Sequence, residues 1–385
     1  MNEHAPTAKP ARRTLLQKVR RVAPIGIGAL LVSVLARVGV LSMWRPGTPR
    51  PFLDKSGHIL QGSIAEKIRV EINGIAQGMF IKGKNRSNPV LLWLHGGPGM
   101  PDYFLTEQYP TGLEDLFTIV WWDQRGAGLS YNPDIPPETM IVEQFISDTI
   151  EVADYLRERF GQHKIYLLGH SWGSFIGIQT AARAPERFHA YIGMAQMVHQ
   201  LKSEKLAYDY MLAEYRNRGD TDMVNDLEKA PVSMVQGTPQ AYLKVRDKAM
   251  HRLGIGTTHD MTSVITGIFL ASWRFPEYTL AEKIGLWRGR AFSRSFGLWE
   301  EIIRVDLAEV VPKLGLPVYL VHGLFDYTCS FTLAQDYFRE LSAPVKGFYR
   351  FENSAHSPIL EEPELGHDVL QIDVLGSGTS LAAIR

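Results

Sequence analysis

Short apolar runs alternate with helix-like stretches along most of the 385-residue chain. The stretch 140–160, for example, repeats apolar residues every three or four positions, which is typical of an amphipathic helix. Short apolar strands that alternate with such helices favour a mostly parallel sheet with helices on both faces. The expected strands lie at residues 90–94, 117–122, 165–168, 190–194, 317–321 and 348–351. The pattern therefore predicts an α/β fold with a doubly covered central sheet.

A hairpin is predicted ahead of this alternation. Residues 64–72 and 76–81 have the pattern of two strands, and Asn73-Gly74 stands between them. This dipeptide is favoured in two-residue hairpin turns because both positions can adopt positive φ angles. The sheet is therefore expected to begin with two antiparallel strands.

The strand-helix alternation stops between residues 196 and 298, where the apolar spacing is helical and no buried strand is evident. We therefore predict one sheet domain in two parts, 57–195 and 299–375, with a helical cap inserted at 196–298. Residues 376–385 begin with a run of Gly, Ser and Thr, which predicts a disordered tail.

The N-terminal region has a different composition. Residues 1–21 carry six Lys or Arg and one acid, and residues 22–44 are mostly apolar with Arg37 as the single charged residue. A basic leader before an apolar segment of about 20 residues predicts a transmembrane anchor with the folded body on the extracytoplasmic side. Residues 45–56, with several Pro and Gly, are expected to form a linker.

Two other interpretations of this region remain open. The uninterrupted apolar run 22–36 is also of the length found in export signals that are cleaved, and Arg12-Arg13 resembles the start of a twin-arginine signal. Alternatively, the segment forms an amphipathic helix that packs on the body.

Composition excludes several classes of function. The 41 basic and 41 acidic residues balance, so no basic face for a nucleic acid is expected. The single cysteine, Cys329, excludes an intramolecular disulfide and a cysteine-based zinc site. The histidines near the motifs lack metal-ligand spacing, and no phosphate-binding glycine loop follows the first strand. We therefore expect neither a metal nor a cofactor.

The motif Gly-His-Ser-Trp-Gly at residues 169–173 is the strongest chemical signal. It follows an apolar strand and precedes a helical run, as in the G-x-S-x-G turn that projects a nucleophilic serine from the sheet edge. The glycines two residues before and two residues after the serine have no Cβ, so neighbouring backbone segments can come close to the strained turn. Ser171 is therefore the predicted nucleophile.

A serine nucleophile needs a base, and that base needs an orienting acid. His356 directly follows the last predicted strand, and Asp326 follows the strand before it. Open α/β sheets bind their ligands at the carboxyl ends of the strands, and the chain order Ser, Asp, His matches that of serine hydrolases with this turn. We predict His356 as general base and Asp326 as its orienting residue.

Acyl transfer also needs N–H donors for the developing oxyanion. The backbone N–H of Trp172 is expected to be one donor, and Gly97 in the His-Gly-Gly-Pro-Gly loop 95–99 the other. Gly96 in this loop is expected to line the substrate site. We expect the Asp-Gln-Arg-Gly motif at 123–126 to brace the loop through an Asp123–Arg125 interaction.

These motifs together resemble the proline iminopeptidase-like branch of the α/β-hydrolase family, over roughly residues 60–372. The resemblance rests on loop 95–99, the segment 123–130 and the motif around Ser171, and His170 departs from the glycine usual in proline-cleaving members. It implies an α/β-hydrolase fold with a helical cap, no cofactor, and release of an N-terminal residue from small peptides. In that family cap carboxylates bind the free amine of the substrate, and Glu204 is the candidate here.

Three functions remain open from the sequence. A serine aminopeptidase acting on small peptide-like substrates is the leading hypothesis. A carboxylesterase would use the same residues on esters, and a membrane-tethered binding protein would keep the scaffold without the reaction. Dehalogenase and epoxide hydrolase chemistry is disfavoured because Ser171 stands where those reactions need a carboxylate.

Overall fold

The computed structural model describes residues 32–33, 36 and 47–384. Eight strands form one sheet: β1 (Ile64–Ile72), β2 (Ile75–Gly83), β3 (Val90–Leu94), β4 (Thr118–Trp122), β5 (Ile165–His170), β6 (Phe188–Met194), β7 (Val318–Gly323) and β8 (Lys346–Phe351). Their order is β1-β2-β4-β3-β5-β6-β7-β8. The pairs β1–β2 and β2–β4 are antiparallel and all others are parallel, which confirms the predicted sheet.

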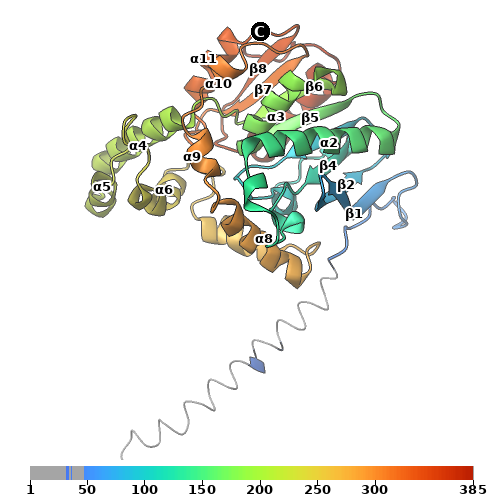
Figure 1. Cartoon of the computed structure of the whole chain (residues 1–385), viewed down its shortest axis with the longest axis horizontal. Helices are drawn as coiled ribbons and strands as arrows, with labels where there is room; N and C mark the ends of the chain where they lie inside the picture. The colour runs from blue at the N-terminus through green and yellow to red at the C-terminus, as the bar shows by residue number, and fades with distance from the viewer. Residues whose placement is uncertain (1–31, 34–35, 37–46, 385) are drawn as a thin grey trace, which may run out of the picture.

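Helices lie on both faces of the sheet (Figure 1). The helices of the sheet domain are α2 (Val142–Phe160), α3 (Trp172–Arg183), α11 (Phe331–Glu340), α12 (Pro358–Glu361), α13 (Pro363–Asp368) and the π-helix η7 (Val369–Val374). Short 3₁₀ turns connect them: η1 (Tyr103–Glu107), η2 (Leu113–Asp115), η3 (Gly128–Ser130), η4 (Pro137–Thr139) and η5 (Pro185–Arg187). This arrangement confirms the predicted α/β-hydrolase fold class.

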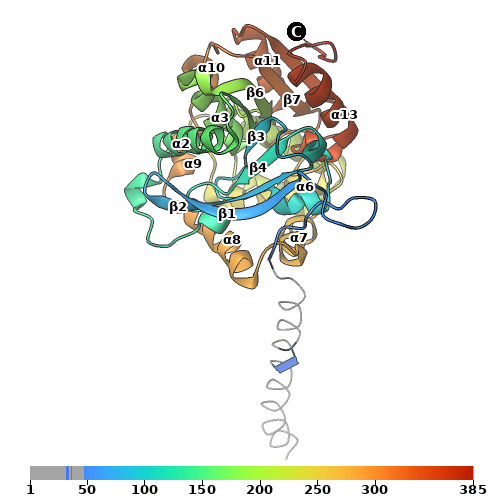
Figure 2. The ribbon, with the colours of Figure 1, turned by 90° about the vertical axis from the view of Figure 1, so that its right-hand side faces the viewer.

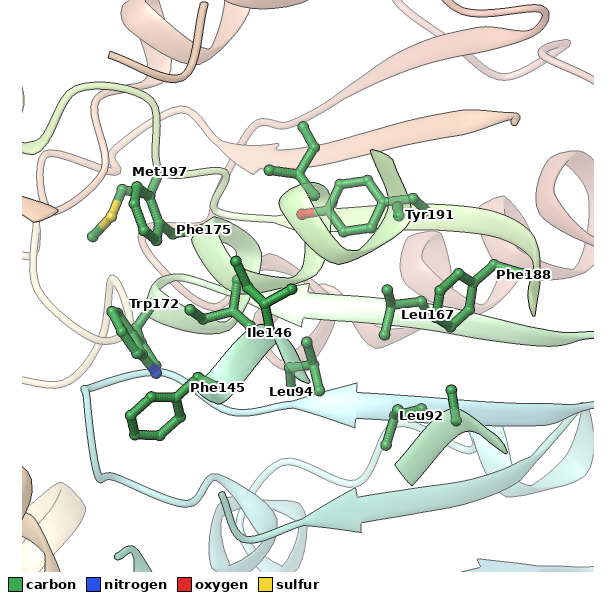
Figure 3. Close-up of a cluster of buried hydrophobic side chains, with 14 of the residues drawn as sticks. Leu92, Leu94, Phe145, Ile146, Leu167, Trp172, Phe175, Phe188, Tyr191 and Met197 are labelled. Carbon is green, nitrogen blue, oxygen red and sulfur yellow. The ribbon is translucent and has the colours of Figure 1, made fainter. Parts of the chain in front are cut away.

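The apolar runs of the parallel strands are continuous because both of their faces are buried. In β3, Leu92 and Leu94 pack toward α2 and α3, whereas Leu91 and Trp93 pack into the cluster on the opposite face. Figure 3 shows the first of these clusters, with side chains from the strands and from α2 and α3 in contact. Burial of each such side chain stabilises the fold by about 1.5–3 kcal/mol.

The predicted hairpin and the predicted end of α2 are confirmed in detail. β1 and β2 pair with Ile72 opposite Ile75, and the turn residues Asn73 and Gly74 have φ angles of 44° and 74°. α2 ends at Phe160, the last residue of the predicted helix, and the following Gly161 has a φ of 63°, the left-handed conformation that glycine adopts at low cost.

Helices fill the chain between β6 and β7. They are α4 (Gln200–Asn217), α5 (Thr221–Glu228), α6 (Gln240–Arg252), the π-helix η6 (Ile265–Phe269), α7 (Leu270–Arg274), α8 (Leu280–Ser293), α9 (Leu298–Ile302) and α10 (Leu307–Val310). α4, α5 and α6 share an apolar cluster of their own and project to the left in Figure 1. The helical stretch thus begins close to the predicted residue 196 but continues past 298.

The C-terminal tail is ordered, so the prediction of a disordered tail at 376–385 is wrong for the residues described there. Ile384 pairs with Phe348 at the open edge of β8, with the Phe348 amide donating to the Ile384 oxygen at 2.9 Å. Buried Asp373 accepts hydrogen bonds from Ser380 and Leu381. These contacts fix a segment whose composition alone suggested disorder.

The predicted leader 1–21 and all but three positions of the segment 22–44 lie outside the described residues. A helix able to span a bilayer is not found in the part of the chain that the structure describes.

Candidate active site

Ser171 lies in the sharp turn between β5 and α3. Its φ of 54° and ψ of −118° are rare for a residue with a side chain and indicate a strained backbone. Gly169 and Gly173 make this turn sterically possible. A Cβ on Gly173 would collide with the carbonyl oxygen of Leu94, and a Cβ on Gly169 with that of Gly173.

The structure brings His356 and Asp326 together at the same edge of the sheet. The Nδ1 atom of His356 lies 2.9 Å from Asp326 Oδ2, although the two residues are 30 positions apart. The other carboxylate oxygen accepts the backbone N–H groups of Thr328 and Cys329, each at 2.9 Å. His322 Nε2 lies 3.3 Å from Asp326 Oδ2. The carboxylate is therefore fixed from several sides, and it fixes the tautomer of His356.

Burial and charge set the protonation of this pair. Burial lowers the pKa of His356 below its usual 6.5, and the neighbouring Asp326 opposes this only in part. Burial opposes ionisation of Asp326, but His356 and His322 outweigh it and hold the pKa of the carboxyl well below its usual range. His356 is therefore a neutral imidazole beside an ionised carboxylate at neutral pH, the state required of a general base.

Ser171 shares a cavity wall with His356, but within the described structure its hydroxyl does not hydrogen-bond the histidine. The Ser171 oxygen instead lies 4.0 Å from the sulfur of Cys329. Such catalytic hydrogen bonds are often long without substrate. Cys329 itself is buried, which raises the pKa of its thiol well above the usual value. Cys329 is therefore a buried, un-ionised thiol rather than a nucleophile.

The two amides predicted to hold an oxyanion have no protein partner among the described residues. Trp172 is the first residue of α3, where N–H groups have no partner inside the helix. The Gly97 amide donates no hydrogen bond within the described chain. Gly97 has a φ of 122°, and an added Cβ would crowd the backbone of Gly99. Gly96 approaches the side chain of Ser171 closely, and both Gly96 and Gly97 line the cavity.

The loop at 95–99 is braced by Gln124. The Gln124 side chain donates to the His95 oxygen at 2.9 Å and accepts from the Trp172 indole N–H at 2.8 Å. The Gln124 backbone N–H donates to His95 Nε2 at 3.1 Å. One side chain therefore links the two segments that carry the predicted oxyanion amides.

The predicted Asp123–Arg125 interaction is wrong. Arg125 forms a buried bidentate pair with Asp148 on α2, at 2.7 and 3.0 Å. Asp123 accepts the Leu129 N–H at 2.7 Å, and burial raises the pKa of its carboxyl to about 8. Because Arg125 is paired with Asp148, buried Asp123 has no guanidinium partner among the described residues, and its carboxyl stays protonated at neutral pH.

A second buried Asp–His pair, which no sequence pattern predicted, adjoins Ser171. His170 Nδ1 lies 2.8 Å from Asp102 Oδ2, and His170 Nε2 lies 2.9 Å from the backbone oxygen of His356. The Trp93 indole also donates to Asp102, at 3.2 Å. Asp102 stands 68 residues before His170, so no local pattern connects the two. The one sequence feature that pointed to this pair was a histidine, and not the glycine usual in proline-cleaving members, before Ser171.

Glu204 does not face the cavity. Its carboxylate is fully buried and accepts hydrogen bonds from Arg246 at 2.7 Å, Tyr242 at 2.9 Å and Gln200 at 2.9 Å. With these partners satisfied, the placement contradicts the hypothesis that Glu204 binds a substrate amine. Its role in the structure is to neutralise the partly buried Arg246.

The cavity beside Ser171 has a volume of about 580 Å³, which suits a small organic substrate. The sheet domain contributes Gly96, Gly97, His170, Ser171 and His356, and the helical stretch between β6 and β7 covers the other side. Among the described residues, no group of three or more His, Cys, Asp or Glu side chains could hold a metal ion.

The sheet order, the turn at Ser171 and the His356–Asp326 pair define an α/β-hydrolase. The chain belongs to the α/β-hydrolase fold family, which it matches over residues 89–363.

Similar proteins with known names indicate which branch of the α/β-hydrolase family the chain resembles. The chain is 32% identical over 305 residues to the probable aminopeptidase YbaC of Bacillus subtilis (strain 168), covering 79% of this chain and 94% of that protein. It is 26% identical over 292 residues to a proline iminopeptidase of Clostridium botulinum, covering 73% and 87%. A proline iminopeptidase-related protein of Thermus thermophilus shares the fold, with a TM-score of 0.56, 20% identity and coverage of 81% and 98%. The resemblance to the proline iminopeptidase-like branch is confirmed, and the protein is a hydrolase of this family.

Proposed function

We propose that the protein is a serine aminopeptidase of the proline iminopeptidase type that cleaves small peptide-like substrates through an acyl-enzyme. The observation that carries this proposal is the fixed His356–Asp326 pair on the same cavity as the strained Ser171. The names of the relatives support the aminopeptidase class.

In the proposed reaction, Ser171 Oγ attacks the substrate carbonyl carbon while His356 Nε2 takes the hydroxyl proton. Asp326 stabilises the resulting imidazolium. The Gly97 and Trp172 amides bind the oxyanion, and His356 returns the proton to the leaving amine as the C–N bond breaks. A water, activated by His356, then attacks the ester and releases the acid, which restores Ser171.

The free ammonium group of the substrate needs a carboxylate on the cavity wall. Two carboxylates from the helical stretch line the cavity, those of Asp247 on α6 and Glu300 on α9. We propose that these, and not Glu204, bind the ammonium group. Burial opposes the ionisation of Asp247, but Arg246 and Arg290 outweigh it and lower the pKa of the carboxyl. Asp247 is therefore charged at neutral pH. Its Oδ1 atom accepts from Arg246 at 3.1 Å, but its side chain is 42% exposed, whereas that of Glu204 is fully buried.

A carboxylesterase is the second candidate. The buried position of Glu204 favours it, because the acid first expected to recognise an amine is already paired with Arg246. The same three residues would cleave an ester, and no ammonium recognition would then be needed.

The purified full-length protein should be assayed with proline and alanine arylamides and with short-chain nitrophenyl esters. We expect arylamide turnover that is lost in Ser171→Ala. Substitution of Asp247 by Asn should raise KM for arylamides and leave KM for the esters unchanged, because the esters carry no ammonium group.

Turnover of esters alone would support the carboxylesterase. If neither substrate class is hydrolysed and Ser171 does not react with a fluorophosphonate, the proposal of serine catalysis fails, and a binding function on the hydrolase scaffold is supported instead.

A further inference from the structure

The helical stretch exposes a strip of apolar side chains beside the cavity. Ile265 and Phe269 on η6 are 62% and 40% exposed, and Leu280 and Ile284 on α8 are 39% and 43% exposed. The ring of Phe269 lies 5.0 Å from that of half-buried Trp287, which connects the two pairs. We name these five residues the cap strip. A contiguous exposed apolar surface of this kind usually marks an interaction site.

The cap strip follows one side of α8. Leu280, Ile284 and Trp287 stand at positions i, i+4 and i+7, which share one helix face. Two arginines nearby are exposed: Arg288 lies on α8, and Arg294 directly follows its last residue. Helices that lie in a membrane interface combine Trp, Phe or Leu on one face with Arg or Lys beside it.

The chain enters the folded body next to this strip. Gly47, the first residue of the continuous described chain, packs directly against Thr279, which is the N-cap of α8 and precedes Leu280. Figures 1 and 2 show the blue chain before β1 running down to the end of the body that carries α8. Residues 22–44, which are mostly apolar with Arg37 as their single charged residue, end only three positions before Gly47.

We propose that the cap strip rests on the surface of a lipid bilayer containing anionic lipids, to which residues 22–44 attach the chain. The position of Gly47 keeps the strip close to any membrane that holds that segment. The arginines beside the strip favour lipid phosphates over an apolar protein partner. Ile265, Phe269 and Trp287 also line the cavity, so the cavity borders the surface that rests on the lipid.

The proposal is tested with an environment-sensitive fluorophore on single introduced cysteines. The full chain carrying Ile284→Cys is labelled and reconstituted into phosphatidylcholine–phosphatidylglycerol vesicles that contain doxyl-labelled lipid. The matched control is Val235→Cys, on the loop between α5 and α6, where the native side chain is 86% exposed. The native thiol of Cys329 is buried and should not react, which the labelled wild-type chain checks.

We expect a blue-shifted emission and strong quenching by doxyl lipid at position 284, and little of either at 235. Leu280→Cys, one helical turn away, should behave like Ile284→Cys, and an unchanged unfolding midpoint shows that each variant is folded. Equal weak quenching at all three positions would overturn the proposal. It would also be overturned if position 284 is protected from aqueous iodide but not quenched by lipid, because residues 22–44 or a second copy would then cover the strip.

Discussion

The Nε2 atom of His170 lies 2.9 Å from the backbone oxygen of His356. The other ring nitrogen faces the carboxylate of Asp102 at 2.8 Å. Both partners accept hydrogen bonds, so both nitrogens must carry protons. Burial opposes this charge, but Asp102 outweighs it and raises the pKa of His170 above its usual 6.5. The residue before the nucleophile is therefore an imidazolium that holds the loop of the proposed base in place.

Substitution of His170 by Gln should lower both stability and activity. A glutamine cannot donate to Asp102 and to the His356 oxygen as the flat ring does, and Asp102 is left as an unpaired buried charge. We expect a loss of about 3–5 kcal/mol in the free energy of unfolding. We also expect kcat to fall by roughly 10- to 100-fold because the base is misplaced. Urea unfolding and steady-state kinetics measure the two effects.

The double variant His170→Gln, Asp102→Asn is the control for this interpretation. It removes both charges of the pair, so it should recover part of the stability lost in the single variant. A double variant no more stable than His170→Gln would contradict the charge-pair account. The stability contributed by His170 should also disappear as the pH rises through its raised folded pKa, and it should be fully present below pH 6.5.

The pH dependence of kcat/KM should report on His356. Burial lowers the pKa of this imidazole, so its neutral form persists at pH values where an ordinary histidine is half protonated. We therefore expect the acid limb of the profile to have its midpoint below pH 6.5. The free enzyme's groups determine kcat/KM, so the profile is measured at low substrate concentration. An acid limb centred above 6.5 would contradict the assigned environment of His356.

Gly173→Ala should prevent the turn at Ser171 from forming. The added Cβ would collide with the Leu94 carbonyl oxygen on β3, and neither backbone segment can move without disturbing the sheet. We expect a loss of more than about 3 kcal/mol in stability and no measurable activity. Gly285→Ala on α8 is the matched control, because its Cβ meets only the Gly128 oxygen, at 3.4 Å. The control should be unchanged or more stable by up to about 1 kcal/mol.

Gln124→Ala should separate support of the oxyanion loop from general stability. The Trp172 indole and the His95 oxygen lose their partner, which costs about 1–3 kcal/mol. Because oxyanion donors act mainly in the transition state, kcat should fall while KM changes little. Gln179→Ala is the comparison, since Gln179 is also buried but donates only to Phe175 within α3. An equal loss of kcat in both variants would show that the effect is not specific to the loop.

The sequence predicted the parts of the site that depend on strand ends. Ser171, Asp326 and His356 each follow an apolar run, and parallel strands bring their carboxyl ends to one edge of the sheet. The glycines around Ser171 were predictable for a local reason, since a sharp turn excludes a Cβ. These inferences needed only the alternation of elements and the chemistry of the turn.

Contacts between distant segments could not be predicted in this way. The Asp102–His170 pair spans 68 residues and the bond of Gln124 to His95 spans 29, and no periodic pattern connects either pair. The motif at 123–126 was recognised, but the wrong side chains were paired. Glu204 was misassigned because sequence spacing does not show that Arg246, on another helix, neutralises it.

Labelling of the full-length protein with a fluorophosphonate, followed by peptide mapping, tests the central claim most directly. The probe reacts only with a serine that a neighbouring base activates. We predict a single phosphonylated residue, Ser171, with labelling lost in Ser171→Ala and strongly slowed in His356→Gln and Asp326→Asn. A folded protein in which Ser171 stays unmodified, or in which His356→Gln is labelled as fast as the unaltered chain, would contradict the account.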